Sequence, residues 1–353
     1  MRVSIHQSLL IIILFFATLV KGQEVHYSQF YALPVTLNPA MTGFADAPYR
    51  IAGIYRSQWA SFAPFITQSL SAEFMPQLGD PDDPSNTNKL GLGALVTRDQ
   101  AGVDAGLRTI KMSGSAAYNM DLGPMYLGAG LQAGFVQRTL FGNHTFPDQW
   151  SDSDGGIDKA AVSSDHSRID GTIGYPDVSA GLLTIYKFGE ETKNAAHAGV
   201  SLYHLLPSNE RFISDASYQN LTPMRMVGHI GARVKLSASS PISIVPNVIY
   251  MTLPRVRSRE INIGGDVEYD FSQINSSYAG IVSGGAYYRV GDAIIVHAAM
   301  GVEDFLVGFS YDITASKLST ASNYNGGFEL SIRFQPIKNM TIKRLIHQPC
   351  PVI

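Results

Sequence analysis

The chain has 353 residues, only 16% of which are charged, and its formal net charge at pH 7 is −3. This balance excludes the concentrated positive charge that nucleic-acid binding requires. Its 33 glycines and 17 tyrosines are many for a soluble enzyme of this size. Both residue types are typical of β-barrel walls, as small lumen-facing residues and as interfacial girdles.

Residues 1–22 have the features of an export signal. Arg2 provides the positive charge, residues 9–19 form the apolar run, and Gly22 is a small residue ahead of an expected cut before Gln23. The apolar run is shorter than the roughly 20 residues that span a bilayer, and no later segment predicts a transmembrane helix. We therefore expect the mature chain to leave the cytoplasm.

The segment after the expected cut, residues 23–48, lacks strand alternation and is interrupted by prolines, which predicts an irregular stretch ahead of the first strand. Exposed segments outside the wall more often bind partners than hold a fold. The best candidates for a partner-binding patch are five residues of this segment: Tyr27, Phe30, Tyr31, Asn38 and Pro39. The alternative is that they fold back and cap the periplasmic mouth of a barrel for stability alone.

Residues 49–336 are dominated by strands with one apolar and one polar face. Phe328, Leu330 and Ile332 alternate with Glu329 and Ser331, for example, and helical periodicity is almost absent. Exported strands of this kind form either a soluble all-β fold or a barrel whose apolar face meets lipid. Fourteen strands are predicted, near 50–58, 65–75, 90–98, 108–121, 125–138, 177–187, 196–204, 224–237, 242–253, 259–270, 279–289, 292–300, 303–314 and 326–336.

Most of these strands reach the roughly 9–11 residues that cross a bilayer, and their even number leaves both chain ends in the periplasm. The sequence therefore predicts an all-β fold: an antiparallel outer-membrane barrel over residues 49–336, followed by a periplasmic tail, 337–353. The long polar connections 139–176 and 205–223 then lie outside the cell. The connection 76–89 is long yet periplasmic, which means that either the first hairpin is misread or this loop is a periplasmic contact.

Two local patterns have only superficial likeness to ligand sites. The acidic run in residues 152–158 lacks the ligand pattern of an EF-hand, which favours a solvated loop over a calcium site. Gly128, Gly130 and Gly134 are not the dinucleotide fingerprint, because they lie within a predicted strand with no helix following. Close packing of small residues in a barrel wall explains them.

No constellation of catalytic residues emerges, so no enzymatic activity and no cofactor or metal is expected. His229 and His297 lie on the polar face of predicted strands, and serines are plentiful, but no G-x-S-x-G motif occurs. The single cysteine, Cys350, cannot form an internal disulfide.

Several segments resemble the PorP/SprF family of type IX secretion-associated outer-membrane proteins. They span the mature chain in order, and they are HYSQFYALPVTLNPAMTGF (26–44), YRSQW (55–59), LGLGALVTRDQAG (90–102), YDITASKLS (311–319), NGGFELSIRF (325–334) and PCP (349–351).

The resemblance implies a bacterial outer-membrane barrel that helps deliver or anchor secreted adhesins, including those of gliding motility, at the cell surface. The implied partners are membrane lipid, the C-terminal domain of a secreted adhesin, and a peptidoglycan-anchored periplasmic component of the secretion machinery. Two alternatives stay open. The first is a porin or channel for small solutes, and the second is an outer-membrane enzyme such as a lipid hydrolase.

Overall fold

The computed structural model describes residues 25–45, 47–59, 64–76, 89–102, 106–140, 149–151, 155–158, 161, 163, 171–189, 194–212, 220–271, 280–317 and 319–336. The expected export signal, the C-terminal tail with Cys350, and Asp152 and Asp154 of the acidic run lie outside these residues.

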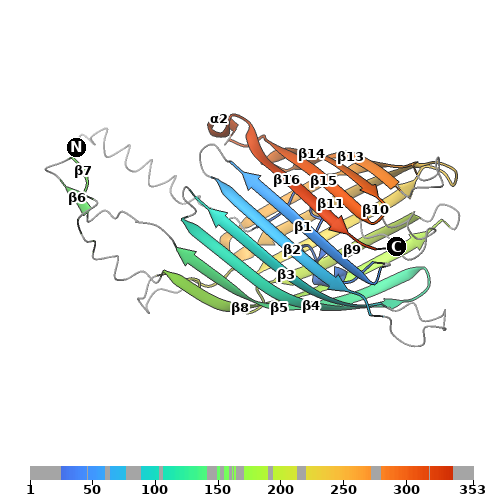
Figure 1. The fold of residues 1–353 in the computed structure, drawn as a ribbon, viewed down its shortest axis with the longest axis horizontal. Helices are drawn as coiled ribbons and strands as arrows, with labels where there is room; N and C mark the ends of the chain where they lie inside the picture. The colour runs from blue at the N-terminus through green and yellow to red at the C-terminus, as the bar shows by residue number, and fades with distance from the viewer. Residues whose placement is uncertain are drawn as a thin grey trace, which may run out of the picture.

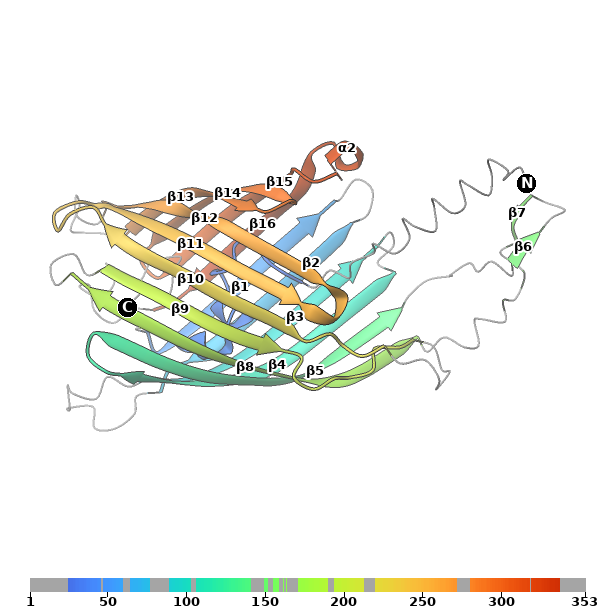
Figure 2. The same ribbon diagram turned by 180° about the vertical axis from the view of Figure 1, so that it is seen from behind.

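Fourteen antiparallel strands form a closed barrel, in which neighbours in the chain pair and β1 pairs with β16 (Figures 1 and 2). The strands are β1 Tyr49–Gln58, β2 Phe65–Phe74, β3 Lys89–Ala101, β4 Leu107–Asp121, β5 Met125–Leu140, β8 Thr172–Phe188, β9 Asn194–Tyr203, β10 Arg225–Lys235, β11 Ile242–Leu253, β12 Ser258–Asp270, β13 Gly280–Arg289, β14 Ala293–Val302, β15 Phe305–Thr314 and β16 Asn325–Phe334.

The remaining elements are short. A small hairpin of β6 (Trp150–Ser151) and β7 (Gly156–Ile157) lies in the β5–β8 connection. The helices are η2 (Pro34–Thr36), η3 (Pro39–Met41), η7 (Pro254–Val256) and α2 (Ser319–Ser322). Within the described ranges, no helix is long and apolar enough to cross a membrane.

The predicted all-β barrel and its strand number are confirmed. The largest difference is in β8, which begins at Thr172 rather than at residue 177. Pro176 lacks an N–H, but β9 pairs with β8 only from Ala180 onward. Pro176 therefore needs no ladder donor on that side, which is where a strand tolerates proline.

The alternation predicted from the sequence separates the two surfaces of the wall. Ile332 faces outward with 52% of its surface exposed, and its neighbour Ser331 faces the lumen with 7% exposed. Outward-facing aromatic residues gather near both ends of the strands, as in interfacial girdles. They are Tyr49, Phe74, Tyr118, Tyr186 and Phe305 at one end, and Phe135, Tyr250, Tyr288 and Phe328 at the other.

The two ends of the barrel differ in their connections. The β5–β8 connection (141–171) and the β9–β10 connection (204–224) lie at one end, whereas short turns such as 122–124 and 303–304 lie at the other. Outer-membrane barrels carry long connections outside the cell, so we name these the outer and the periplasmic end. Because β2 pairs with both β1 and β3 along its length, the first hairpin was read correctly. The β2–β3 connection (75–88) therefore starts and ends at the end that we name periplasmic.

Candidate functional site

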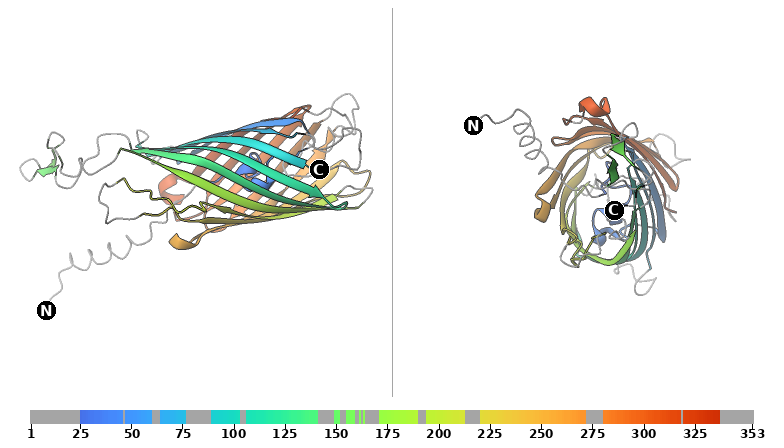
Figure 3. Two further views of the ribbon diagram at one scale, coloured as in Figure 1. Left: turned by 90° about the horizontal axis from the view of Figure 1, so that it is seen from below. Right: turned by 90° about the vertical axis from the view of Figure 1, so that its left-hand side faces the viewer.

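Residues 25–45 lie inside the barrel, and we call this segment the plug (Figure 3). Its first residue is near the outer end, where Arg225 Nη1, at the start of β10, donates to the Val25 carbonyl at 3.2 Å. Its last turn is near the periplasmic end, where the Gly43 N–H donates to Glu73 of β2 at 2.7 Å. The plug therefore runs from the outer half of the lumen to the periplasmic end, where the chain continues into β1.

The structure brings all five residues of the predicted partner-binding patch into the lumen, where each is buried. Tyr31 donates to or accepts from His197 Nε2 at 2.8 Å, and the edge of the Phe30 ring meets Tyr287 at 5.3 Å. Burial raises the pKa of the Tyr27 phenol, whose oxygen lies 2.5 Å from Ser69 Oγ. In this state the five side chains contact the wall of their own barrel.

Asn38 is the main polar contact of the central plug. Its side-chain oxygen accepts from the Ala40 N–H at 2.9 Å and so caps η3, whose first residue is Pro39. Its amide nitrogen lies 2.9 Å from the Leu182 carbonyl oxygen and 3.1 Å from His229 Nε2. One amide thus joins the plug to β8 and β10, and its complete burial makes those bonds costly to lose.

Inward-facing glycines let the plug approach the wall. At Gly130 an added Cβ would lie 2.5 Å from Ala40 N and would overlap the Pro39 carbonyl. Collisions with the plug would also occur at Gly91, Gly181 and Gly199. The GxGxxxG pattern in β5 therefore has a more specific cause at Gly130 than close packing within the wall, because this glycine makes room for η3.

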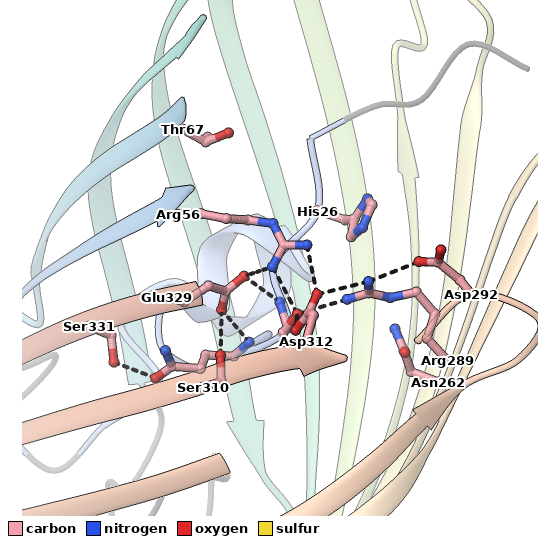
Figure 4. Close-up of polar contacts among 12 residues, drawn as sticks. His26, Arg56, Thr67, Asn262, Arg289, Asp292, Ser310, Asp312, Glu329 and Ser331 are labelled. Atoms are coloured by element: carbon pink, nitrogen blue, oxygen red, sulfur yellow. Dashed lines mark hydrogen bonds and ion pairs between the residues drawn. The ribbon is translucent and has the colours of Figure 1, made fainter. Parts of the chain in front are cut away.

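A buried cluster of charged wall residues binds Ser28 and Gln29 of the plug (Figure 4). Glu329 of β16 forms an ion pair with Arg56 of β1, and Asp312 of β15 pairs with Arg56 at 2.9 Å and with Arg289 of β13 at 3.1 Å. The two Glu329 oxygens accept the backbone N–H groups of Ser28 and Gln29, both at 2.7 Å. Ser28 Oγ donates to Asp312 at 2.6 Å. The plug thus adds its own hydrogen-bond donors to wall charges that already pair with one another.

Sequence reasoning missed this cluster, although all of its residues except Arg289 lie within the segments that carry the family resemblance. Ser28 and Gln29 belong to 26–44 and Arg56 to 55–59, whereas Asp312 and Glu329 belong to the two segments near the C-terminus. The available signal was a charged residue on the polar face in each of the three strand segments, namely Arg56, Asp312 and Glu329. Their meeting depends on barrel closure, which places Arg56 directly opposite Glu329.

A second set of contacts fixes the periplasmic end of the plug. Glu73 pairs with Arg50 of β1 at 2.6 Å while it accepts the Gly43 N–H. Thr42 Oγ1 donates to Ser115 at 3.0 Å, and Phe44 meets the Tyr126 ring edge-on. The plug is therefore tied to the wall at both ends and in the middle.

The outer half of the lumen, above the plug, is hollow. This cavity, the vestibule, has a volume of about 400 Å³. Val25, Tyr27 and Leu37 of the plug line it, and the β9–β10 connection borders it through Glu210, which accepts from Arg138 at 3.0 Å.

The two histidines on the polar face of their strands hydrogen-bond the plug and a wall carboxylate. Among the described residues, His229 bonds Asn38, and His297 bonds Asp266 at 2.8 Å, while no serine hydrogen-bonds either ring.

Residues 19–334 match the family described as type IX secretion system membrane protein PorP/SprF. No curated protein matches the chain. Similar solved structures include the translocator domain of autotransporter NalP from Neisseria meningitidis (9% identity, 82% of this chain, 88% of that chain, TM-score 0.41). Another is the P. putida toluene transporter TodX (9% identity, 86% of this chain, 93% of that chain, TM-score 0.48). A third is BamA from Haemophilus ducreyi lacking POTRA domains 1-3 (9% identity, 82% of this chain, 70% of that chain, TM-score 0.38). Because the identities and TM-scores are low, no binding or transport property of these three proteins is transferred to the chain.

Proposed function

Because the chain belongs to the PorP/SprF family of type IX secretion system membrane proteins, we propose that its outer-membrane barrel helps deliver or anchor a secreted adhesin at the cell surface. The partners in this proposal are the C-terminal domain of the adhesin and a peptidoglycan-anchored periplasmic component of the same machinery. The family is one of secretion membrane proteins, and we propose no enzymatic role.

The observation that carries the proposal is the plug. A channel for solutes needs an open polar lumen, whereas here the wall's charges at Arg56, Asp312 and Glu329 contact the plug. The plug residues bury most of their surface, and the central turn η3 lies against β4, β5 and β8. An anchor in the outer membrane has to remain sealed while a large protein is attached to it, and a tightly bonded plug meets that need.

The proposal gives the five residues of the predicted partner-binding patch a second role, inside the barrel. Buried as they are, Tyr27, Phe30, Tyr31, Asn38 and Pro39 can meet a partner only if the plug moves. We keep their docking role as a prediction and propose that, in the resting barrel, they seal the lumen.

The test is deletion of residues 25–44 in a strain whose adhesin display is measurable. We expect the barrel to remain in the outer membrane, with its heat-modifiable gel mobility, while adhesin display is lost and purified protein conducts ions in planar bilayers. Normal display without the plug would refute its role in anchoring. If a strain lacking the whole protein also displayed adhesin normally, and the intact protein conducted ions, the channel alternative would be correct.

A further inference from the structure

The vestibule has two chemically different walls. Ile249, Met251 and Leu253 of β11 and Val256 of η7 form an apolar wall. The opposite wall, from β3, β4 and β5, is mostly polar: Leu95 and Val136 are apolar, and the other lining residues are Thr97, Asp99, Thr109, Lys111, Gln132 and Arg138. At about 400 Å³, the cavity falls within the range of roughly 300–1,000 Å³ that holds a drug-sized ligand.

Two residues of the polar wall each carry a hydrogen-bond donor that is buried and has no partner among the described residues. Gln132 is 3% exposed, borders the vestibule, and its amide Nε2 has no hydrogen-bond partner among the described residues. Arg138 Nε is likewise unbonded there, although its Nη1 pairs with Glu210. Buried donors without partners are costly, so a ligand that brings acceptors to this wall would be stabilised.

We infer that the vestibule receives a short extended peptide segment of the surface-retained protein, entering from the outer end. This inference rests on the proposed function. An extended peptide points successive side chains to opposite sides, which suits one apolar and one polar wall. It also carries a carbonyl acceptor on every residue, which the buried, unpaired donors of Gln132 and Arg138 would reach by a change of side-chain rotamer. A purely apolar ligand would leave both donors unpaired.

The first experiment fills the cavity. Thr109 faces the vestibule, and its neighbour Ile110 lies on the opposite face of β4, toward lipid, so Thr109→Trp and Ile110→Trp form a matched pair. Both variants should insert with normal heat-modifiable mobility. Adhesin display should fall at least about tenfold in Thr109→Trp, the ratio given by about 1.4 kcal/mol of lost binding, and stay normal in Ile110→Trp.

The second experiment locates the peptide. A photoreactive benzophenone amino acid at Met251 faces the vestibule, whereas the same group at Tyr250 faces lipid. Irradiated cells should yield a cross-link from position 251, but not from 250, to one short segment of the displayed adhesin, identified by mass spectrometry.

The outcomes separate the two proposals. If Thr109→Trp displays adhesin normally, or if position 251 cross-links no adhesin peptide, the vestibule inference is wrong. Loss of display on deletion of residues 25–44 would still uphold the anchoring function in that case. Normal display in a strain without the protein overturns both. A cross-link at 251 to a small lipid-like molecule instead of a peptide also overturns the vestibule inference.

Discussion

Arg56 of β1 and Glu329 of β16 are direct cross-strand partners at the seam that closes the barrel, and they form a buried ion pair inside it. The same Glu329 carboxylate accepts the backbone N–H groups of Ser28 and Gln29. Barrel closure and plug binding therefore share one carboxylate. The strand pair that closes the barrel therefore also binds the plug.

Glu329→Gln should weaken both closure and the plug. The substitution removes the carboxylate that pairs with Arg56 and leaves Asp312 to pair with both Arg56 and Arg289. Breaking a buried ion pair costs about 3–5 kcal/mol. We expect a lower midpoint in urea unfolding of the detergent-solubilised barrel. Leu330→Ala, which faces lipid on the same strand, is the control for general loosening of β16. Equal midpoints for Glu329→Gln and the wild type would show that the ion pair contributes no net stability.

Gly130→Ala should displace the plug, because the new Cβ would overlap the backbone of Pro39 and Ala40, which cannot rotate away. Overpacking of this kind costs about 1–3 kcal/mol. Gly114→Ala on β4 is the matched control, since the atom nearest to its added Cβ is the Gly93 carbonyl oxygen at 3.8 Å. Planar-bilayer recordings should show ion conductance for Gly130→Ala and none for Gly114→Ala. Closed traces for both would mean that the plug tolerates the methyl group.

Met112→Arg should impair insertion far more than Thr109→Arg on the same strand. Met112 is 57% exposed and faces lipid in the middle of β4, where an arginine costs about 2–4 kcal/mol. Thr109 faces the vestibule, where the charge can be hydrated. Thr109 is a better lumen-facing control than Ser331 of β16. The Ser331 hydroxyl donates to Gln29 of the plug at 2.7 Å, so a substitution there would also disturb the plug. Folded yield in the outer membrane is the measurement, and equal yields would contradict the face assignment.

The direction of the plug predicts which of its ends is reachable from outside the cell. In a Cys350→Ser background, Val25→Cys should react with a small membrane-impermeant maleimide on intact cells, because Val25 borders the vestibule. Ala45→Cys should react only after the outer membrane is permeabilised, since it lies beyond Gly43 at the periplasmic end. The reverse pattern would show that the barrel is inserted with the opposite orientation.

The sequence by itself determined the barrel, its strand number and the two faces of its wall. These properties follow from a period of two residues, which is local: Ile332 faces lipid and Ser331 faces the lumen because a strand alternates its side chains. The even strand count also places the start of β1 and the end of β16 at the same end of the barrel. The aromatic, proline-broken composition of residues 23–48 also marked them as distinct from the wall.

Only the tertiary structure decided where that segment lies and what it contacts. Ser28 meets Glu329 across 301 positions in the chain, and Asn38 meets His229 across 191. Such contacts depend on the register of closure and on the lumen that closure encloses, and no short-range pattern encodes either. The same holds for Gly130 and Gln132, two inward-facing residues of one strand. The former has to lack a side chain because η3 passes against it, and the latter borders a cavity that exists only above the plug.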